Sequence, residues 1–254
     1  MRRLLALVAA AALLVPGCAR SASAHDRTLT VFAASSLTAA FTQIGKDFEA
    51  ADPGVMVTFN FGPSDGLAAS IQSEGTADVF ASASGTWMDA VARSPGVSDR
   101  ADFARNRLVI ITPPNDPAKV TSIEDLANPG VKLVLAAAGV PVGDYAREAL
   151  KSAGVLTPAL ANVVSNEEDD ASVVAKIASG EADAGIVYAS DVTEAVAPTV
   201  RAVQIPDAQN VIATYPIAVV SGGPQPDLAR AFVAFVTGSE GRATLAKFGF
   251  LPPS

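Results

Sequence analysis

The sequence predicts an α/β fold in which short buried strands alternate with amphipathic helices. Residues 29–34 form an apolar run without charge, which is typical of a buried parallel strand. Directly after it, apolar residues follow one another at spacings of four, three and four, as on one face of a helix. These residues are Leu37, Phe41, Ile44 and Phe48. The same order of strand, small-residue loop and helix recurs along the chain, so we expect repeated α/β units.

The N-terminus predicts export from the cytoplasm. Two arginines precede an apolar run at residues 4–15 that is too short to span a membrane. The run leads into Leu-Val-Pro-Gly-Cys, which resembles a bacterial lipobox, so we expect a signal peptide at residues 1–17 and a lipid on Cys18. The alternative is a plain secretory signal with an incidental cysteine. Residues 18–28 are small and polar, as in a flexible tether, and they contain the only histidine, His25.

A second strand–helix unit follows the first. Apolar residues alternate from residue 55 to residue 61, which predicts a strand, and residues 62–66 form a loop with Gly, Pro and Ser before a helix. Residues 75–83 turn into a third short strand. Residues 85–91 are expected to form a helix in which Trp87 packs against its neighbours.

Two strands are expected to cross between two lobes. Residues 106–112 are rich in β-branched side chains and end at two prolines, where we place the first crossing. Residues 214–220 have the pattern of the strand that returns. The predicted first lobe comprises residues 29–109 and 217–254, and the predicted second lobe comprises residues 110–216.

The second lobe repeats the α/β pattern, and the chain then ends in two helices of the first lobe. Ser122 begins a segment that fits a capped helix start. A loop of small residues at 137–143 separates a strand from a helix. The expected strands are residues 132–136, 163–165 and 184–188, and the expected helices are residues 144–153, a segment that begins near residue 170, and residues 226–236 and 239–248.

Composition and charge exclude several functions. The formal net charge of −8 and the lack of a basic run argue against nucleic-acid binding. Residues 29–254 contain neither histidine nor cysteine, which excludes a histidine general base, a cysteine nucleophile and thiolate or imidazole metal sites. The sequence also has no phosphate-binding or dinucleotide-binding glycine loop. The acidic run at residues 167–170 is interpreted as a solvated helix start rather than as a catalytic pair.

The predicted strand ends carry hydrogen-bond donors instead. Hydroxyl groups and the N–H groups of helix N-termini lie at the carboxyl edges of the sheets, where open α/β folds bind ligands. The donors are Ser35, Ser36, Ser64, the turn at residues 140–143, the helix start near Asp170, and Tyr188. They suit a fully deprotonated tetrahedral oxyanion, because such an ion has only acceptors, whereas a protonated phosphate would need a carboxylate as well. A lone serine at such a junction can also be a simple N-cap.

Four segments together resemble the molybdate-binding proteins of bacterial ABC importers. They are Val-Phe-Ala-Ala-Ser-Ser-Leu-Thr at residues 31–38, Phe-Gly-Pro-Ser-Asp-Gly-Leu at 61–67, Ala-Asp-Val-Phe-Ala-Ser-Ala at 77–83, and Gly-Glu-Ala-Asp-Ala-Gly-Ile-Val-Tyr at 180–188. Each segment is weak by itself, but the combination is specific and extends over the whole domain. The resemblance implies a type II periplasmic-binding-protein fold with two lobes, two crossover strands and an oxyanion in the interlobe cleft.

The resemblance also implies a function and a set of ligand-binding residues. A monomer without cofactor or catalysis is expected to capture molybdate, and tungstate with it, outside the cytoplasm and to deliver it to an ABC permease. Ser36 and Ser64 are each expected to provide a hydroxyl and an N–H group, and Tyr188 a hydroxyl. Val142 and Asp170 are expected to offer backbone N–H groups.

Three residues at two sites depart from the pattern of this family. Pro63 and Asp65 flank Ser64, where small hydroxyl residues are usual, and Asp170 stands where an apolar residue is common. A carboxylate repels a dianion, so both acidic side chains are expected to point away from the cleft, or the specificity differs.

Two alternative functions remain. One is the same fold with sulfate or another tetrahedral oxyanion as its ligand. The other is a secreted hydrolase with Ser36 or Ser64 as its nucleophile, although the domain offers it no histidine base.

Overall fold

The computed structural model describes residues 27–254. The predicted signal peptide at residues 1–17, the lipidation at Cys18 and the tether residue His25 lie outside the described residues. Arg27 and Thr28, which were predicted to end the tether, already belong to the first strand. Every helix within residues 27–254 is too short or too polar to cross a membrane.

The strands join into one nine-stranded sheet with the order β2-β1-β3-β9-β4-β7-β5-β6, and β8 pairs with β4. Strand β1 is parallel to β2 and β3, and β5 is parallel to β6 and β7. Two parallel sets are therefore joined by the antiparallel strands β4 and β9. The bounds are β1 (Arg27–Ala34), β2 (Val55–Gly62), β3 (Val79–Ala81), β4 (Val97–Thr112), β5 (Leu133–Ala136), β6 (Val163–Glu167), β7 (Ala184–Tyr188), β8 (Arg201–Gln204) and β9 (Ile212–Val220).

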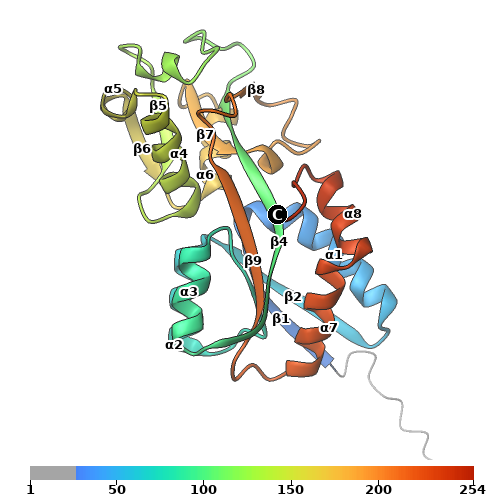
Figure 1. The fold of residues 1–254 in the computed structure, drawn as a ribbon. Helices are drawn as coiled ribbons and strands as arrows, with labels where there is room; N and C mark the ends of the chain where they lie inside the picture. Colours follow the sequence, from blue (N-terminus) through green and yellow to red (C-terminus); the bar gives the residue numbers. More distant parts are fainter. Residues whose placement is uncertain (1–26) are drawn as a thin grey trace, which may run out of the picture.

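Strands β4 and β9 run between two lobes (Figure 1), which confirms the predicted two-lobed α/β fold with two crossover strands. The first part of β4, residues 97–107, pairs with β9, and residues 108–112 pair with β7 and β8. Strand β4 begins at Val97 rather than at residue 106, because pairing with β9 extends it through a polar segment without strand periodicity. The lobe boundaries after residues 109 and 216 stay a prediction.

Helices cover the sheet of the first lobe. The apolar face predicted for α1 is buried, and its Phe41 and Phe48 rings lie 6.1 and 5.2 Å from the ring of Phe232 in edge-to-face contact. The ring of Phe41 also lies 6.2 Å from Phe59 of β2 and 5.7 Å from Phe103 of β4, which fixes α1 against the sheet, and with it the loop that joins α1 to β1. The helices of this lobe are η1 (Ser35–Leu37), α1 (Thr38–Ala51), α2 (Ser64–Glu74), α3 (Gly85–Arg93), α7 (Pro226–Thr237) and α8 (Ser239–Lys247).

The second lobe differs from the prediction in its short elements. The expected helix near residue 122 is the short 3-10 helix η2 (Glu124–Ala127), and neither α5 (Leu156–Ala161) nor β8 was predicted. Helix α5 contains a proline, and β8 has only one buried residue in four, so neither has the apolar run by which the equally short β5 and β7 were predicted. The other helices are α4 (Pro141–Ser152), α6 (Asp170–Ala178) and η3 (Ala189–Asp191).

Candidate functional site

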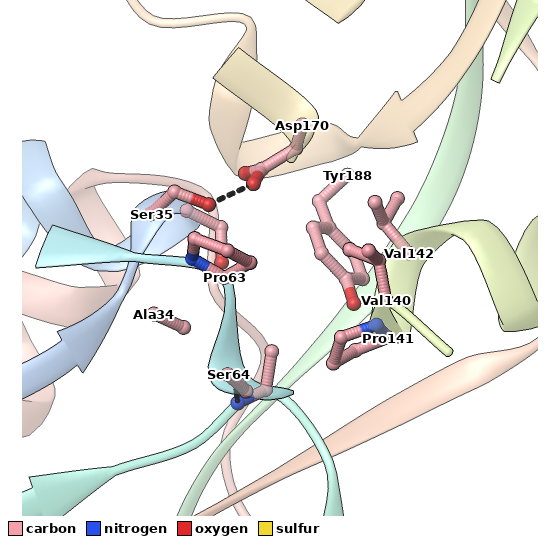
Figure 2. A pocket seen from close by; sticks show the side chains of 11 residues that line it. Ala34, Ser35, Pro63, Ser64, Val140, Pro141, Val142, Asp170 and Tyr188 are labelled. Carbon is pink, nitrogen blue, oxygen red and sulfur yellow. Dashed lines mark hydrogen bonds between the residues drawn. The ribbon is translucent and has the colours of Figure 1, made fainter. Parts of the chain in front are cut away.

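A small cavity lies where the helix N-termini of the two lobes approach each other (Figure 2). Its empty volume is about 190 Å³, including the part that is open to solvent. The lining residues are Ala34, Ser35, Ser36, Pro63, Ser64, Ala83, Val140, Pro141, Val142, Asp170 and Tyr188. These eleven residues include no Lys, Arg or His, so the cavity offers hydroxyl and backbone donors but no cationic side chain.

The structure brings all five predicted site residues to this cavity. Ser36, Ser64, Val142, Asp170 and Tyr188 line it, and each is at most 7% exposed. They come from the carboxyl ends of β1 and β7 and from the first turns of α2, α4 and α6. N–H groups in a first helical turn have no partner within the helix. Their role as oxyanion ligands stays a prediction.

Ser64 is held so that its hydroxyl proton is free. It is the first residue of α2 and is fully buried. The backbone N–H of Ala83 donates to Ser64 Oγ at 3.0 Å. Because this bond occupies the oxygen as an acceptor, the hydroxyl proton can be donated to a ligand in the cavity.

The first turn of α4 begins earlier than predicted, and this brings Val142 to the cavity. Residues 137–143 were predicted to form a loop, but the helix begins at Pro141. Proline at the first helical position was the signal that could have shown this start. The Arg147 guanidinium stabilises this turn, because it donates hydrogen bonds to the carbonyl oxygens of Ala136 at 2.8 Å and Gly143 at 2.7 Å.

Tyr188 presents a polar atom that lacks a partner. Its hydroxyl is buried and makes no hydrogen bond within the described residues. Figure 2 shows the ring extending into the cavity, with the hydroxyl near Pro141. Burial raises the pKa of Tyr188 well above its ordinary value, so the hydroxyl keeps its proton. A buried donor without an acceptor costs about 1–3 kcal/mol, and an anion in the cavity would supply that acceptor.

The carboxyl of Asp170 lies in the cavity wall instead of pointing away from the cleft, so the other expected outcome, a different specificity, stays a prediction. It is 4% exposed and accepts a hydrogen bond from Ser35 Oγ across the lobes (Figure 2). Burial raises the pKa of Asp170, and the titration of Asp170 is linked to that of the neighbouring Asp191 carboxyl. The hydrogen bond from Ser35 partly offsets the charge of Asp170. Asp65 does not line the cavity, as expected.

The Asp170–Asp191 pair predicts a pH-dependent stability. Burial, followed by the charge of Asp170, raises the pKa of Asp191 well above the ordinary 3.8. The folded protein therefore binds more protons than the unfolded chain above about pH 4, and its free energy of unfolding falls as the pH rises through that window. Asp191→Asn keeps an oxygen for the N–H of Tyr188, which now donates to Asp191 at 2.8 Å, and its amide can donate to Asp170.

We expect Asp191→Asn to be more stable than the parent at neutral pH, with a difference that widens as the pH rises above about 4. Urea unfolding at a series of pH values measures this difference. Parallel stability curves for the two proteins would contradict a raised pKa of Asp191 in the folded protein.

Hydrogen bonds from Ser35 and Trp87 of the first lobe reach the second lobe next to the cavity. One is the bond between Ser35 and Asp170, and in the other Trp87 Nε1 donates to the carbonyl oxygen of Gly139 at 3.0 Å. The sequence identified Ser35 as a donor and Trp87 as a packing residue, but it did not pair them with partners in the other lobe. Residues 135 positions apart, such as Ser35 and Asp170, share no local pattern that could reveal a contact.

The chain is similar to known bacterial solute-binding proteins over most of its length. Residues 29–251 match the family described as "Bacterial extracellular solute-binding protein". The chain is 42% identical over 228 residues to the molybdate-binding protein ModA of Mycobacterium tuberculosis, and the match covers 89% of this chain and 85% of that protein.

Two solved structures share the fold at low sequence identity. The periplasmic molybdate-binding protein of Azotobacter vinelandii matches with a TM-score of 0.77 and 19% identity, over 89% of this chain and 100% of that chain. The sulfate-binding protein SubI from Mycobacterium tuberculosis matches with a TM-score of 0.77 and 16% identity, over 89% of this chain and 87% of that chain. At such identities the likeness shows the fold and does not identify a ligand.

Proposed function

The chain belongs to the family of bacterial extracellular solute-binding proteins, and from this premise we propose that it captures molybdate for an ABC importer. The 42% identity to ModA over most of both chains supports molybdate as the ligand. Tungstate has the same charge and tetrahedral shape and is proposed as a second ligand. The proposal includes a lipid anchor at Cys18 that keeps a monomer outside the cytoplasm, near the membrane permease that receives the oxyanion.

The observation that carries the proposal is the partnerless hydroxyl of Tyr188 in a cavity whose one carboxyl group, that of Asp170, already accepts a hydrogen bond from Ser35. The proton of Ser64 is also free, because its oxygen accepts from the N–H of Ala83. First-turn N–H groups of α2, α4 and α6 add further donors and the positive ends of three helix dipoles. An ion with only acceptors and two negative charges satisfies this set.

The same contacts argue against the hydrolase alternative. Ser36 Oγ lies 2.9 Å from the hydroxyl of Tyr215, and Ser64 Oγ accepts from a backbone N–H. A serine nucleophile needs a neighbouring general base, and neither partner is one. We propose that the protein binds its ligand without chemical change.

Selectivity in solution tests the proposal. Calorimetric titration near neutral pH should give tight binding of molybdate and tungstate, weaker binding of sulfate, and almost no binding of phosphate, which carries a proton that the donors cannot accept. The expected ratio of molybdate to sulfate affinity is about a hundredfold or more, which corresponds to about 2.7 kcal/mol. Tight sulfate binding with weak molybdate binding would overturn the proposal in favour of the sulfate alternative.

A further inference from the structure

We propose that Tyr215 and Asn106 are positioning residues that orient the hydroxyl of Ser36, so that its proton points to the ligand. This inference rests on the proposed function, because it assigns a direction to one of the oxyanion's donors. Neither residue lines the cavity, and both lie behind Ser36 on the crossover strands, Tyr215 on β9 and Asn106 on β4.

A buried chain of hydrogen bonds connects these residues to Ser36. Asn106 Nδ2 lies 2.8 Å from Ser190 Oγ and 3.5 Å from the hydroxyl of Tyr215. The Tyr215 hydroxyl lies 2.9 Å from Ser36 Oγ. Asn106 and Tyr215 are fully buried, and Ser190 and Ser36 are 5% and 7% exposed. Low exposure makes the direction of each bond matter, because solvent is not available to satisfy a misdirected group.

The amide of Asn106 sets the direction of this chain. Its Oδ1 accepts from the backbone N–H of Arg107 at 3.0 Å, and this fixes which end of the amide is the NH₂ group. The NH₂ group can only donate, so it donates to Ser190 and, through a longer and weaker bond, to the oxygen of Tyr215.

The direction of the Asn106 amide also decides where the hydroxyl protons of Tyr215 and Ser36 point. Because the oxygen of Tyr215 accepts from Asn106, the proton of Tyr215 is directed to Ser36 Oγ. Burial raises the pKa of Tyr215 well above its ordinary value, so that proton is retained. Ser36 Oγ then acts as an acceptor toward Tyr215, and its proton remains for the cavity. This is the arrangement that the N–H of Ala83 imposes on Ser64.

The opposite direction would weaken anion binding. If Ser36 donated to Tyr215, the lone pairs of Ser36 Oγ would face an ion whose outer atoms are all acceptors. The orientation set by Tyr215 therefore favours a fully deprotonated oxyanion over a protonated one, which could use an acceptor in the cavity. Tyr215 is in this sense a specificity-determining residue, although it does not reach the ligand.

A double-mutant cycle tests the inference, with molybdate affinity measured by calorimetry for the parent, Tyr215→Phe, Ser36→Ala and the double variant. Ser36→Ala should lose roughly ten- to a hundredfold in affinity. Tyr215→Phe should lose about tenfold, within the range of coupling found in one hydrogen-bond network. In the Ser36→Ala background, the Tyr215→Phe change should cost almost nothing, because the group that it positions is gone.

A second measurement separates positioning from a general structural effect. Phenylalanine keeps the aromatic ring that packs edge-to-face on Phe103, Tyr188 and Phe250, so the variant should fold. In Tyr215→Phe the oxygen of Ser36 no longer accepts from Tyr215, so it can accept the proton of phosphate in the cavity. The ratio of molybdate to phosphate affinity should therefore fall. Additive losses in the cycle with an unchanged ratio would overturn the inference. A parent protein that does not bind molybdate would instead overturn the proposed function.

Discussion

Replacing Tyr188 with phenylalanine is expected to make the ligand-free protein more stable and, at the same time, to weaken molybdate binding roughly ten- to a hundredfold. The hydroxyl of Tyr188 is buried without a partner, which costs about 1–3 kcal/mol in the free protein, and phenylalanine removes that cost while it keeps the ring. The loss of affinity follows because a hydrogen bond to a charged group contributes about 1.5–3 kcal/mol.

Thermal unfolding of the free variant and calorimetry with molybdate measure the two effects separately. Opposite signs are the signature of a group that is held ready for a ligand at a cost to the fold. If Tyr188→Phe lowers stability and leaves affinity unchanged, the hydroxyl has a partner within the protein and does not bind the oxyanion.

Replacing Gly143 with alanine is expected to damage both the fold and the site. A Cβ atom at Gly143 would lie 2.2 Å from the carbonyl oxygen of Ala137 and 2.5 Å from that of Ala136. Both obstacles are backbone atoms, so the first turn of α4 must shift, and the N–H group of Val142 shifts with it. Overpacking of this kind costs about 1–3 kcal/mol or more. Misplacement of a buried donor should lower molybdate affinity by a further factor of about ten or more.

Gly66→Ala is the matched control for this change. Gly66 and Gly143 are each the third residue of a helix whose first turn lines the cavity, but Gly66 is exposed, and a Cβ atom there meets only Pro63 Cγ at 3.5 Å. The control should keep molybdate affinity and gain roughly 0.5–1 kcal/mol of stability from the better helix former. Equal behaviour of the two variants would contradict the steric argument.

The junction between β1 and α1 could be predicted from the sequence because it depends on local patterns, whereas the starts of α4 and β4 were missed. The apolar run of β1 and the spacing of Phe41, Ile44 and Phe48 placed the strand–helix junction at Ser35 and Ser36, where the structure has it. The start of α4 was missed because the small residues at 137–143 indicate a loop, and the signal of Pro141 for a helix start was not used. The N-terminal half of β4 was missed because its pairing with β9 comes from elsewhere in the chain.

The candidate site could be predicted only in part, because contacts between segments far apart in the chain leave no local pattern. The sequence identified Ser64 and Tyr188 as donors, since each follows a recognisable strand or opens a helix. It did not determine the orientation of the Asp170 side chain, because its acceptance from Ser35 depends on how the two lobes meet. It gave no indication that Tyr215 lies against Ser36, 179 residues away.

By itself the sequence determined the α/β class, the two crossovers and a set of neutral donors at strand ends, because strand and helix periods and the residue types at their junctions are local properties. Only the tertiary structure decided which donors keep a free proton. Ser64 keeps a free proton because its oxygen accepts from the N–H of Ala83, and Ser36 keeps one because its oxygen accepts from Tyr215. The hydroxyl of Tyr188 is unsatisfied because it has no hydrogen-bond partner in the described chain. The direction of a hydrogen bond is set by its partner, and these partners meet only when the lobes and crossover strands have packed.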